Sequence, residues 1–281
     1  TPTIKYYSST IKQLLKKMPK KVVDYSTEDI RAYLAVFQRK NKSSKVTIDN
    51  IRRIFSSFFA WLEEEDYIIK SPIRRIHKVK TGTQVKEILT DENIEHLRDN
   101  CIKIRDLAMI DLLASTGMRV GELAGLYWSD IDYENGILNI SKSEKHDRVT
   151  NEYHISETKN AKERFVPLTD QMISLFKRLE QVRTKYNITS DYLFATTTGH
   201  CTPRSISECA RYKCAQAKIP VKSIHAIRRT LNSRMRVNGA DSVTTAALIG
   251  NTPAVNENFY TYDVSEQKYK KELIRKASLC G

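Results

Sequence analysis

Two tyrosines, Tyr260 and Tyr262, stand two positions apart in the polar stretch IGNTPAVNENFYTYD, residues 249–263. A tyrosine hydroxyl can attack a phosphodiester, but its pKa is about 10, so near neutral pH it needs a base or a field of positive charge. On a helix, residues two apart point about 200° away from each other, so both side chains cannot face one phosphate. The pattern therefore predicts one nucleophile at most, with the other tyrosine packed or exposed.

An arginine and a glutamate three residues apart, Arg119 and Glu122, occur in STGMRVGELAGL, shortly after Gly117. On a helix such a pair shares a face, and the carboxylate can hydrogen-bond the guanidinium and steady it. Alone this is an ordinary surface pair. The leucines and valine around Arg119 would hold its charge against apolar packing, however, so the arginine needs an anion. A structural pair and an anion-binding arginine both stay open.

One histidine, His225, is followed by Arg228 and Arg229 in SIHAIRRT. At spacings of three and four residues either arginine can share a helical face with the imidazole, so spacing does not choose between them. Guanidinium groups match phosphoryl oxygens, and an imidazole can donate or move a proton near neutral pH. The group suits a phosphate, although a histidine beside arginines is more often part of a solvated helix surface.

Two lysines, Lys159 and Lys162, lie in TKNAKERFVPL, in a basic turn between two predicted strands. Most basic hairpin tips are solvated. A lysine at such a tip can also reach into DNA and protonate a leaving oxygen.

Most of the chain carries the signals of helices, because apolar residues recur every three to four positions and capping residues stand at the ends. Ser26 with Asp29 is in capping-box register, Thr202 with Pro203 begins a helix, and Gly117 ends one. The expected helices lie within 4–18, 27–40, 43–68, 90–101, 102–115, 119–126, 169–183, 202–218 and 223–239. The apolar stripe of the third consists of Ile48, Ile51, Phe55, Phe58 and Leu62. Alternation and β-branched residues predict strands at 137–142, 152–158 and 164–168.

These elements predict a fold that is mainly α, with a small antiparallel β-sheet in the larger of two domains. Residues 1–80 are expected to form a helical domain, and residues 81–86 a polar, basic linker. Residues 87–281 are expected to form the second domain, which ends in a charged amphipathic segment at about 264–281.

The 281-residue chain has a net charge of +14, and this charge is unevenly distributed. Residues 1–82 hold 18 Lys and Arg against 8 Asp and Glu, a net charge of +10, which leaves +4 for residues 83–281. A solvated lysine-rich surface explains a modest excess but less easily such a skew, so nucleic acid is the expected partner. The residues expected to contact DNA are Lys45, Arg52, Arg53, Lys78, Lys80, Lys162 and Arg204.

Composition argues against several other classes of protein. No apolar run approaches the roughly 18 residues needed to span a bilayer, and no signal-peptide pattern opens the chain, so a soluble cytoplasmic protein is expected. The five cysteines form no Cys-x-x-Cys pair, which argues against a disulfide framework or a zinc ribbon. His200, Cys201, Cys209 and Cys214 fit no common metal-ligand spacing, and no metal or other cofactor is expected.

Taken together and in this order, TGMRVGEL, TKNAKERFVPL, HAIRRT and IGNTPAVNENFYTYD resemble the motifs of the tyrosine recombinase (phage-integrase type) family. The chain looks most like the integrases of phages or conjugative transposons. The resemblance also covers VNGAD, residues 237–241, and the N-terminal helical module, so it spans nearly the whole chain. Each motif alone is weak, but their joint occurrence in order is specific.

The resemblance implies a role for each of seven residues. They are Arg119 as the first catalytic arginine, Glu122 as its buttress, Lys159 as the hairpin lysine, His225 and Arg228 as the H-x-x-R pair, Asn251, and Tyr260 as the nucleophile. In the family, a histidine or tryptophan lies nine residues before the nucleophile. Asn251 stands at that position here, so Tyr260, nine residues later, is the nucleophile that the resemblance implies. Asn251 is thus a departure, since an amide can bond a phosphate oxygen but cannot act as an imidazolium donor or a proton shuttle.

The resemblance also implies the reaction and the partners. The expected reaction passes through a covalent 3′-phosphotyrosyl DNA intermediate and rejoining by the 5′-hydroxyl of a partner duplex, without ATP or metal. The expected partners are double-stranded DNA at specific core sites, clamped between the two domains, and other copies of the chain in a tetramer. Residues 264–281 are expected to pass between protomers, although a terminal helix packed on its own domain is equally open.

Several expectations about biological role follow. The chain is expected to integrate or excise a mobile element in a bacterial cytoplasm, associated with the nucleoid. A type IB topoisomerase, which relaxes supercoils by similar chemistry as a monomer, and an inactive DNA-binding relative stay open as alternatives. Because Thr1 stands directly ahead of a predicted helix, the chain is expected to be part of a longer integrase that carries an arm-binding domain.

Overall fold

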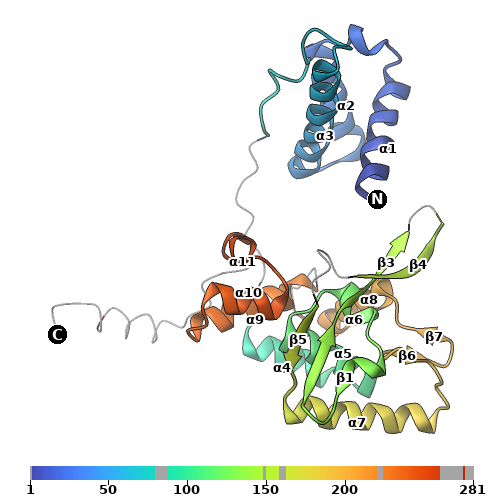
Figure 1. Cartoon of the computed structure of the whole chain (residues 1–281), viewed down its shortest axis with the longest axis vertical. Helices are drawn as coiled ribbons and strands as arrows, with labels where there is room; N and C mark the ends of the chain where they lie inside the picture. Colours follow the sequence, from blue (N-terminus) through green and yellow to red (C-terminus); the bar gives the residue numbers. More distant parts are fainter. Residues whose placement is uncertain are drawn as a thin grey trace. The chain divides into compact units, whose positions relative to one another are not determined.

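The computed structural model describes residues 2–79, 88–147, 150–157, 163–219, 224–259 and 275. The chain divides into two compact units, Thr1–Val85 and Lys86–Gly281, each with its own hydrophobic core (Figure 1). The predicted linker, residues 81–86, lies outside the described residues.

The first unit is a helical bundle. It contains α1 (Pro2–Lys17), a short 3-10 turn η1 (Val22–Asp24), α2 (Thr27–Asn41) and α3 (Lys45–Glu64). α3 packs against both α1 and α2, and its apolar face forms much of the core.

Local sequence explains where α2 begins and what α3 buries. Ser26 Oγ accepts from the backbone of Asp29 at 3.1 Å, and Asp29 Oδ2 accepts from the backbone of Ser26 at 2.9 Å, which is the predicted capping box. α3 buries a wider face than its predicted stripe, because Ile54 and Phe59 are buried as well, while Phe58 is only partly buried. The wider face follows from contact with two helices rather than one.

The second unit is built around α5, in which eight of the thirteen residues are buried. α5 packs against α4, α7, α8 and α9. The helices are α4 (Asp91–Asp99), α5 (Ile104–Thr116), α6 (Val120–Ala124), η2 (Trp128–Asp130), α7 (Asp170–Lys185), α8 (Pro203–Gln216), α9 (His225–Val237), α10 (Ser242–Ile249) and α11 (Pro253–Phe259).

Three small antiparallel sheets lie beside these helices (Figure 1). The first has the order β1-β2-β5, the second pairs β3 with β4, and the third pairs β6 with β7. The strands are β1 (Ile131–Asp132), β2 (Ile137–Ile140), β3 (Lys142–Asp147), β4 (Glu152–Glu157), β5 (Arg164–Pro167), β6 (Ala195–Thr196) and β7 (Gly199–His200). The mainly helical class with a small antiparallel sheet is therefore confirmed.

The predicted hairpin around Lys159 and Lys162 is wrong in its pairing. Both flanking strands exist, but β4 pairs with β3 and β5 pairs with β2, so the two do not form one hairpin. β3, with the sequence KSEKHD, was missed because it has no β-branched residue and no apolar alternation. Lys159 and Lys162 themselves lie outside the described residues.

Two glycines end helices that lead into the candidate site. Gly117 ends α5 with φ +59°, as predicted, and Gly250 ends α10 with φ +71°. Both stand in the left-handed region, where a side chain is strained. Among the described residues, no helix has the length and apolar character to cross a membrane. Of the predicted C-terminal segment, 264–281, only Arg275 is described.

Candidate active site

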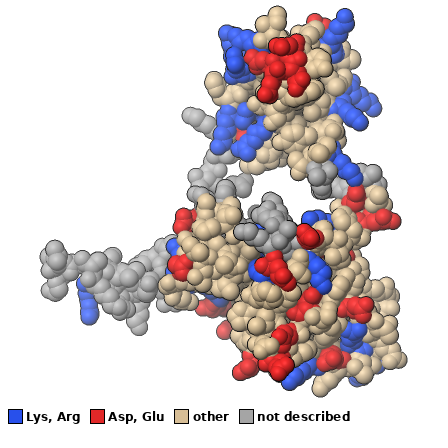
Figure 2. Space-filling view, in the orientation of Figure 1, with Lys and Arg blue, Asp and Glu red and all other residues tan. Residues whose placement is uncertain are grey.

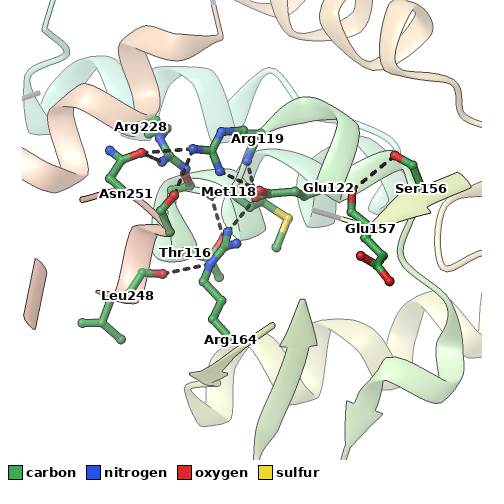
Figure 3. A network of polar contacts seen from close by, with 12 residues as sticks. Thr116, Met118, Arg119, Glu122, Ser156, Glu157, Arg164, Arg228, Leu248 and Asn251 are labelled. Carbon is green, nitrogen blue, oxygen red and sulfur yellow. Dashed lines mark hydrogen bonds and ion pairs between the residues drawn. The ribbon is translucent and has the colours of Figure 1, made fainter. Parts of the chain in front are cut away.

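The centre of the candidate site is the carboxylate of Glu122, whose side chain is only 1% exposed (Figure 3). Its Oε1 accepts from Arg119 Nη1 at 2.8 Å. Its Oε2 accepts from the Arg119 backbone at 2.9 Å and from Arg164 Nη2 at 2.6 Å. Burial alone would raise the pKa of Glu122, but the hydrogen bonds and charges of the two arginines outweigh it and lower the pKa. Glu122 is therefore a fixed anion that orders two guanidiniums.

The pairing of Arg119 with Glu122 arises from a helix start rather than from a shared helical face. Arg119 is the N-cap residue of α6, with φ −76° and ψ 150°, and Glu122 is the third residue of that helix. α6 is placed by its contact with β3, because a Cβ on Gly121 would lie 2.7 Å from the Glu144 carbonyl oxygen. Only glycine allows this approach, which sets where Arg119 emerges.

Two arginines from distant parts of the chain converge on one oxygen. Asn251 Oδ1 accepts from Arg119 Nη2 at 3.0 Å and from Arg228 Nη2 at 2.8 Å. Arg119 Nη2 also donates to the Gly250 carbonyl at 2.9 Å, and Arg228 Nη1 donates to the Gly117 carbonyl at 2.5 Å. This arrangement presents two forked cationic donors to a single acceptor (Figure 3).

The structure distinguishes the two arginines that spacing left open. Arg228 on α9 is 2% exposed and bonds Asn251 and Gly117, whereas Arg229 is half-buried. The face of α9 that packs on α5 and α10 is thus the one that carries Arg228. Spacing could not show this, because three and four residues are equally compatible with one helical face.

His225 is the first residue of α9 and is exposed. Its pKa is lowered, first by partial desolvation and then by the positive charges of Arg228, Arg229 and Arg119. At neutral pH the imidazole is therefore uncharged and can accept a proton.

Asn251 follows the Gly250 turn at the end of α10, and its backbone bonds the Ala246 carbonyl at 2.8 Å. Because two cationic donors face Oδ1, the amide orientation is fixed, and Nδ2 points away from both arginines. Nδ2 is buried and has no hydrogen-bond partner among the described residues. An amide N–H donor is thus available beside the oxygen on which the arginines converge.

The segment that leads to Tyr260 is anchored just before it. α11 ends at Phe259, and the fully buried Asn256 within it donates from Nδ2 to Asn232 Oδ1 on α9. Tyr260 lies outside the described residues, as do Lys80, Lys159 and Lys162. The structure therefore brings together five of the seven sequence-predicted residues, namely Arg119, Glu122, His225, Arg228 and Asn251.

Arg164 is the residue that the sequence analysis missed. It begins β5, is 8% exposed, and bonds Glu122. A signal was present, because Arg164 and Val166 occupy alternate positions of a predicted strand and so face the same side. A charge on the apolar face of a strand indicates a buried ion pair, but the partner cannot be read from local sequence.

In the first unit, the residues predicted to contact DNA gather around a buried carboxylate. Asp49 accepts from Arg52 Nε at 2.8 Å, from Arg53 Nε at 3.0 Å and from the Val79 backbone at 3.2 Å. Lys78 precedes Val79 and is exposed. The Val79 contact therefore brings Lys78 beside the arginines of α3, near an exposed Lys45 at its start. Figure 2 shows Lys and Arg side chains on several parts of the visible face of this unit, beside an acidic patch.

The remaining candidates are less distinctive. Arg204 is exposed at the start of α8 and bonds Glu208 at 2.9 Å, one turn along the same helix. In the described part of the chain, no group of three or more His, Cys, Asp or Glu side chains could hold a metal ion.

Comparison with known proteins gives two family matches. Residues 79–261 match the model of the phage integrase family, and residues 1–69 match the phage integrase N-terminal SAM-like domain. A tyrosine recombinase XerC-like protein of Caldanaerobacter subterraneus subsp. tengcongensis is 28% identical over 266 residues, covering 85% of this chain and 68% of the relative. The tyrosine recombinase XerC of Oceanobacillus iheyensis is 25% identical, covering 92% and 85%.

Solved structures share the fold at lower identity. The Tn1549 transposon integrase in complex with circular intermediate DNA superposes with a TM-score of 0.77 at 18% identity, covering 98% of this chain and 94% of that one. A lambda integrase tetramer bound to a Holliday junction superposes with a TM-score of 0.68 at 17% identity, covering 90% and 72%.

Proposed function

The chain belongs to the phage integrase family of tyrosine recombinases, enzymes that cleave and rejoin DNA, and we propose that it does so through a covalent 3′-phosphotyrosyl intermediate at specific sites. The observation that carries the proposal is the convergence of Arg119 and Arg228 on one oxygen, Asn251 Oδ1, at 3.0 and 2.8 Å. A non-bridging phosphate oxygen in the same place would meet both guanidiniums. Such preorganised donors stabilise the charge that develops in phosphoryl transfer.

The proposed cleavage step uses Tyr260 as the nucleophile. Its oxygen forms a bond to phosphorus, the bond from phosphorus to the 5′ oxygen breaks, and the phenolic proton passes to the neutral imidazole of His225. Lys159 gives a proton to the leaving 5′ oxygen. Rejoining reverses these transfers with a 5′-hydroxyl of the partner duplex. The phosphodiester energy is kept in the phosphotyrosyl bond, so the step requires no ATP, and side chains supply the positive charge.

Asn251 has a different task from the histidine or tryptophan of the family pattern. Its oxygen, held by both arginines, occupies the place proposed for a phosphate oxygen. When a phosphate takes that place, the amide rotates so that Nδ2 becomes the donor to it. Asn251 therefore contributes a hydrogen bond but no proton transfer.

The first unit supplies sequence-independent affinity for the DNA backbone. Its basic residues Lys45, Arg53 and Lys78 are exposed, and its net positive charge exceeds that of the larger unit. We assign the same role to Lys80, Lys162 and Arg204. Backbone contacts of this kind position a protein on a duplex without reading its sequence.

The assembly proposed is a tetramer on two duplexes, in which residues 264–281 pass between protomers. A relative of the same fold is a tetramer on a Holliday junction, which supports a tetramer. Transposon and phage integrases share the fold, which supports integration or excision of a mobile element as the biological role. We infer in addition that this reaction takes place on the bacterial nucleoid.

The test is covalent trapping on a duplex with a nick beside the cleavage position, so that the cleaved end diffuses away. Wild-type protein and Tyr262→Phe should form a covalent complex, and Tyr260→Phe should bind the same DNA without forming one. Trapping by Tyr260→Phe would refute the nucleophile. The absence of trapping by the wild type would favour an inactive DNA-binding protein, and relaxation of plasmid without a specific site would favour a topoisomerase.

A further inference from the structure

Arg164 contacts two parts of the candidate site, the carboxylate of Glu122 and the end of α10. We propose that it is a positioning residue, which fixes Glu122, and through it Arg119, relative to the turn at Gly250 and Asn251. It thereby sets the spacing of the phosphate-binding donors. The inference rests on the proposed function, because that spacing matters for cleavage only if a phosphate is bound between those donors.

The first contact is with the buried carboxylate. Arg164 Nη2 donates to Glu122 Oε2 at 2.6 Å, and the same oxygen accepts from the Arg119 backbone at 2.9 Å. The other oxygen, Oε1, accepts from Arg119 Nη1 at 2.8 Å. With both oxygens occupied from two directions, the carboxylate has one orientation, and that orientation determines where the Arg119 guanidinium lies.

The second contact is with the end of α10. Arg164 Nε donates to the Leu248 carbonyl at 3.1 Å. Its guanidinium lies against Gly250, where a Cβ would be 2.8 Å from Nη1 and 3.0 Å from Cζ. The same turn presents Gly250 O and Asn251 Oδ1 to Arg119 Nη2. Arg164 therefore supports one side of the turn while Arg119 binds the other side.

Arg164 is itself held by the sheet. It begins β5, opposite Ile140 of β2, and is buried on the same side as Val166. A guanidinium anchored in a sheet gives α6 and α10 a common rigid reference, although these helices are far apart in sequence. A lysine cannot replace it, because a single ammonium lacks the planar fork that reaches Glu122 and Leu248 together.

A buried ion pair could instead serve only to stabilise the fold. The two roles differ in what they change. Loss of stability lowers the fraction of active molecules, and so the amplitude of a single-turnover reaction. Misplaced donors lower the rate constant of molecules that are folded and bound to DNA.

The experiment measures single-turnover formation of the covalent complex at saturating nicked DNA, together with DNA affinity and the thermal midpoint. Arg164→Lys keeps the charge but loses the fork. Gly250→Ala pushes a methyl group against the guanidinium and, at φ +71°, also strains the turn, so it disturbs the same contact from the other side. Arg98→Lys is the matched control, because Arg98 binds Asp111 at 2.7 Å and has no described contact with the site.

The rate constants of Arg164→Lys and Gly250→Ala should fall by about ten-fold or more, since small misplacements of reacting groups are costly. DNA affinity should stay within about two-fold, because the donors are displaced rather than removed. Arg98→Lys should keep the wild-type rate constant.

A second substrate, with sulfur in place of the bridging 5′ oxygen, identifies which donors are misplaced. Sulfur leaves without protonation, so it restores a variant that lacks the leaving-group acid, here proposed as Lys159. It should not restore Arg164→Lys. If sulfur restored the rate of Arg164→Lys, the misplaced donors would not be Arg119 and Asn251, and the proposal would be overturned. A fall in amplitude with an unchanged rate constant in both single variants would overturn it as well.

The wild-type reaction separates this inference from the proposed function. If wild-type protein forms no covalent complex, the proposed function fails. If it does, and Arg164→Lys reacts with the same rate constant, only the positioning role of Arg164 fails.

Discussion

Both units of the chain contain a buried carboxylate that binds two arginines, but the arginines are held differently. In the first unit, Asp49 binds Arg52 and Arg53, whose side chains are 14% and 58% exposed. In the second, Glu122 binds two arginines whose side chains are 30% and 8% exposed. Burial alone would raise the pKa of each carboxyl, yet the arginine hydrogen bonds lower the pKa of both. The carboxylates are alike, so the difference lies in what the guanidiniums face.

In the second unit the guanidinium of Arg119 meets that of Arg228 at one acceptor, whereas Arg53 in the first unit projects into solvent. Charges fixed before the substrate binds stabilise a transition state without reorganisation. Exposed charges bind a phosphate backbone mainly by releasing its counterions, and they are sensitive to salt. We therefore expect substitutions in the second unit to change cleavage and substitutions in the first unit to change affinity.

The largest effect is expected from Arg119→Ala and Arg228→Ala. Each removes one of the two cationic donors at the shared acceptor, so the rate constant of covalent-complex formation should fall on the order of 10²-fold or more. DNA affinity should change by only a few-fold, because the backbone contacts proposed for the first unit would remain. Single-turnover trapping and equilibrium binding on the same duplex give the two numbers.

Arg119 is the cleaner of these two positions, because its side chain is 30% exposed, whereas Arg228 is buried and contributes to packing. A thermal midpoint near that of the wild type is the control for folding. If affinity and cleavage fell in parallel, these arginines would bind DNA without acting in the cleavage step, and the contrast between the two units would be lost.

A smaller effect, about ten-fold on affinity at low salt, is expected from Lys45→Gln/Lys78→Gln in the first unit. Both side chains are exposed, and neither has a described ion pair, so each is free to bind a phosphate. The slope of log affinity against log salt should fall by about one for each contact that is lost. Cleavage at saturating DNA should be unchanged. A wild-type slope in the double variant would mean that this face does not contact DNA.

The structural features that could be predicted from sequence are those formed by residues close together in the chain. The capping box of Ser26 and Asp29 and the left-handed Gly117 depend on residues within one turn, and both were predicted correctly. The pairing of Arg119 with Glu122 is equally local and was predicted, although the pair forms at a helix start and not on one helical face. The family resemblance identified the candidate residues from motifs that occur in a fixed order along the chain. Hydrophobic periodicity alone does not identify them.

What could not be predicted depends on contacts between distant segments. Arg164 binds Glu122 across 42 positions of sequence, so its role appears only when β5 lies beside α6. The pairing of β4 with β3 rather than β5 was missed because a polar strand gives no period-2 signal. Arg228 and Arg229 were distinguished only by the packing of α9 on α5 and α10.

A change of a few-fold in the cleavage rate is expected as the pH is lowered. The pKa of His225 is lowered from its usual 6.5, so the ring stays neutral, and able to accept the tyrosine proton, somewhat below pH 6.5. The rate should therefore level off at a lower pH than an imidazole of ordinary pKa would give, and fall as pH drops through the lowered pKa. The stability linked to this group has the same sign, because it is complete above pH 6.5 and is lost as pH falls through the folded-state pKa.

Arg229→Gln tests this assignment without removing a residue of the guanidinium cluster. Its charge contributes to the lowered pKa of His225, so its loss should move the acid limb of the rate profile to higher pH. His225→Gln should remove the limb and slow cleavage at every pH. An acid limb that stays in place in both variants would assign it to a different group.

The smallest effect is expected at Arg204, which differs from the arginines of both units because its carboxylate partner is itself exposed. The Arg204 and Glu208 side chains are 79% and 56% exposed, and their 2.9 Å contact spans one turn of α8. Water screens such a pair, so Glu208 neither fixes the guanidinium nor withdraws it fully from a phosphate. Arg204→Gln should weaken DNA binding by about two-fold, and Glu208→Gln should strengthen it by a similar factor because a competing anion is removed. Filter-binding at two salt concentrations would measure both. If Arg204→Gln lost as much DNA affinity as Lys45→Gln/Lys78→Gln, α8 would contribute to DNA affinity as strongly as the first unit. DNA affinity would then not be concentrated in the first unit.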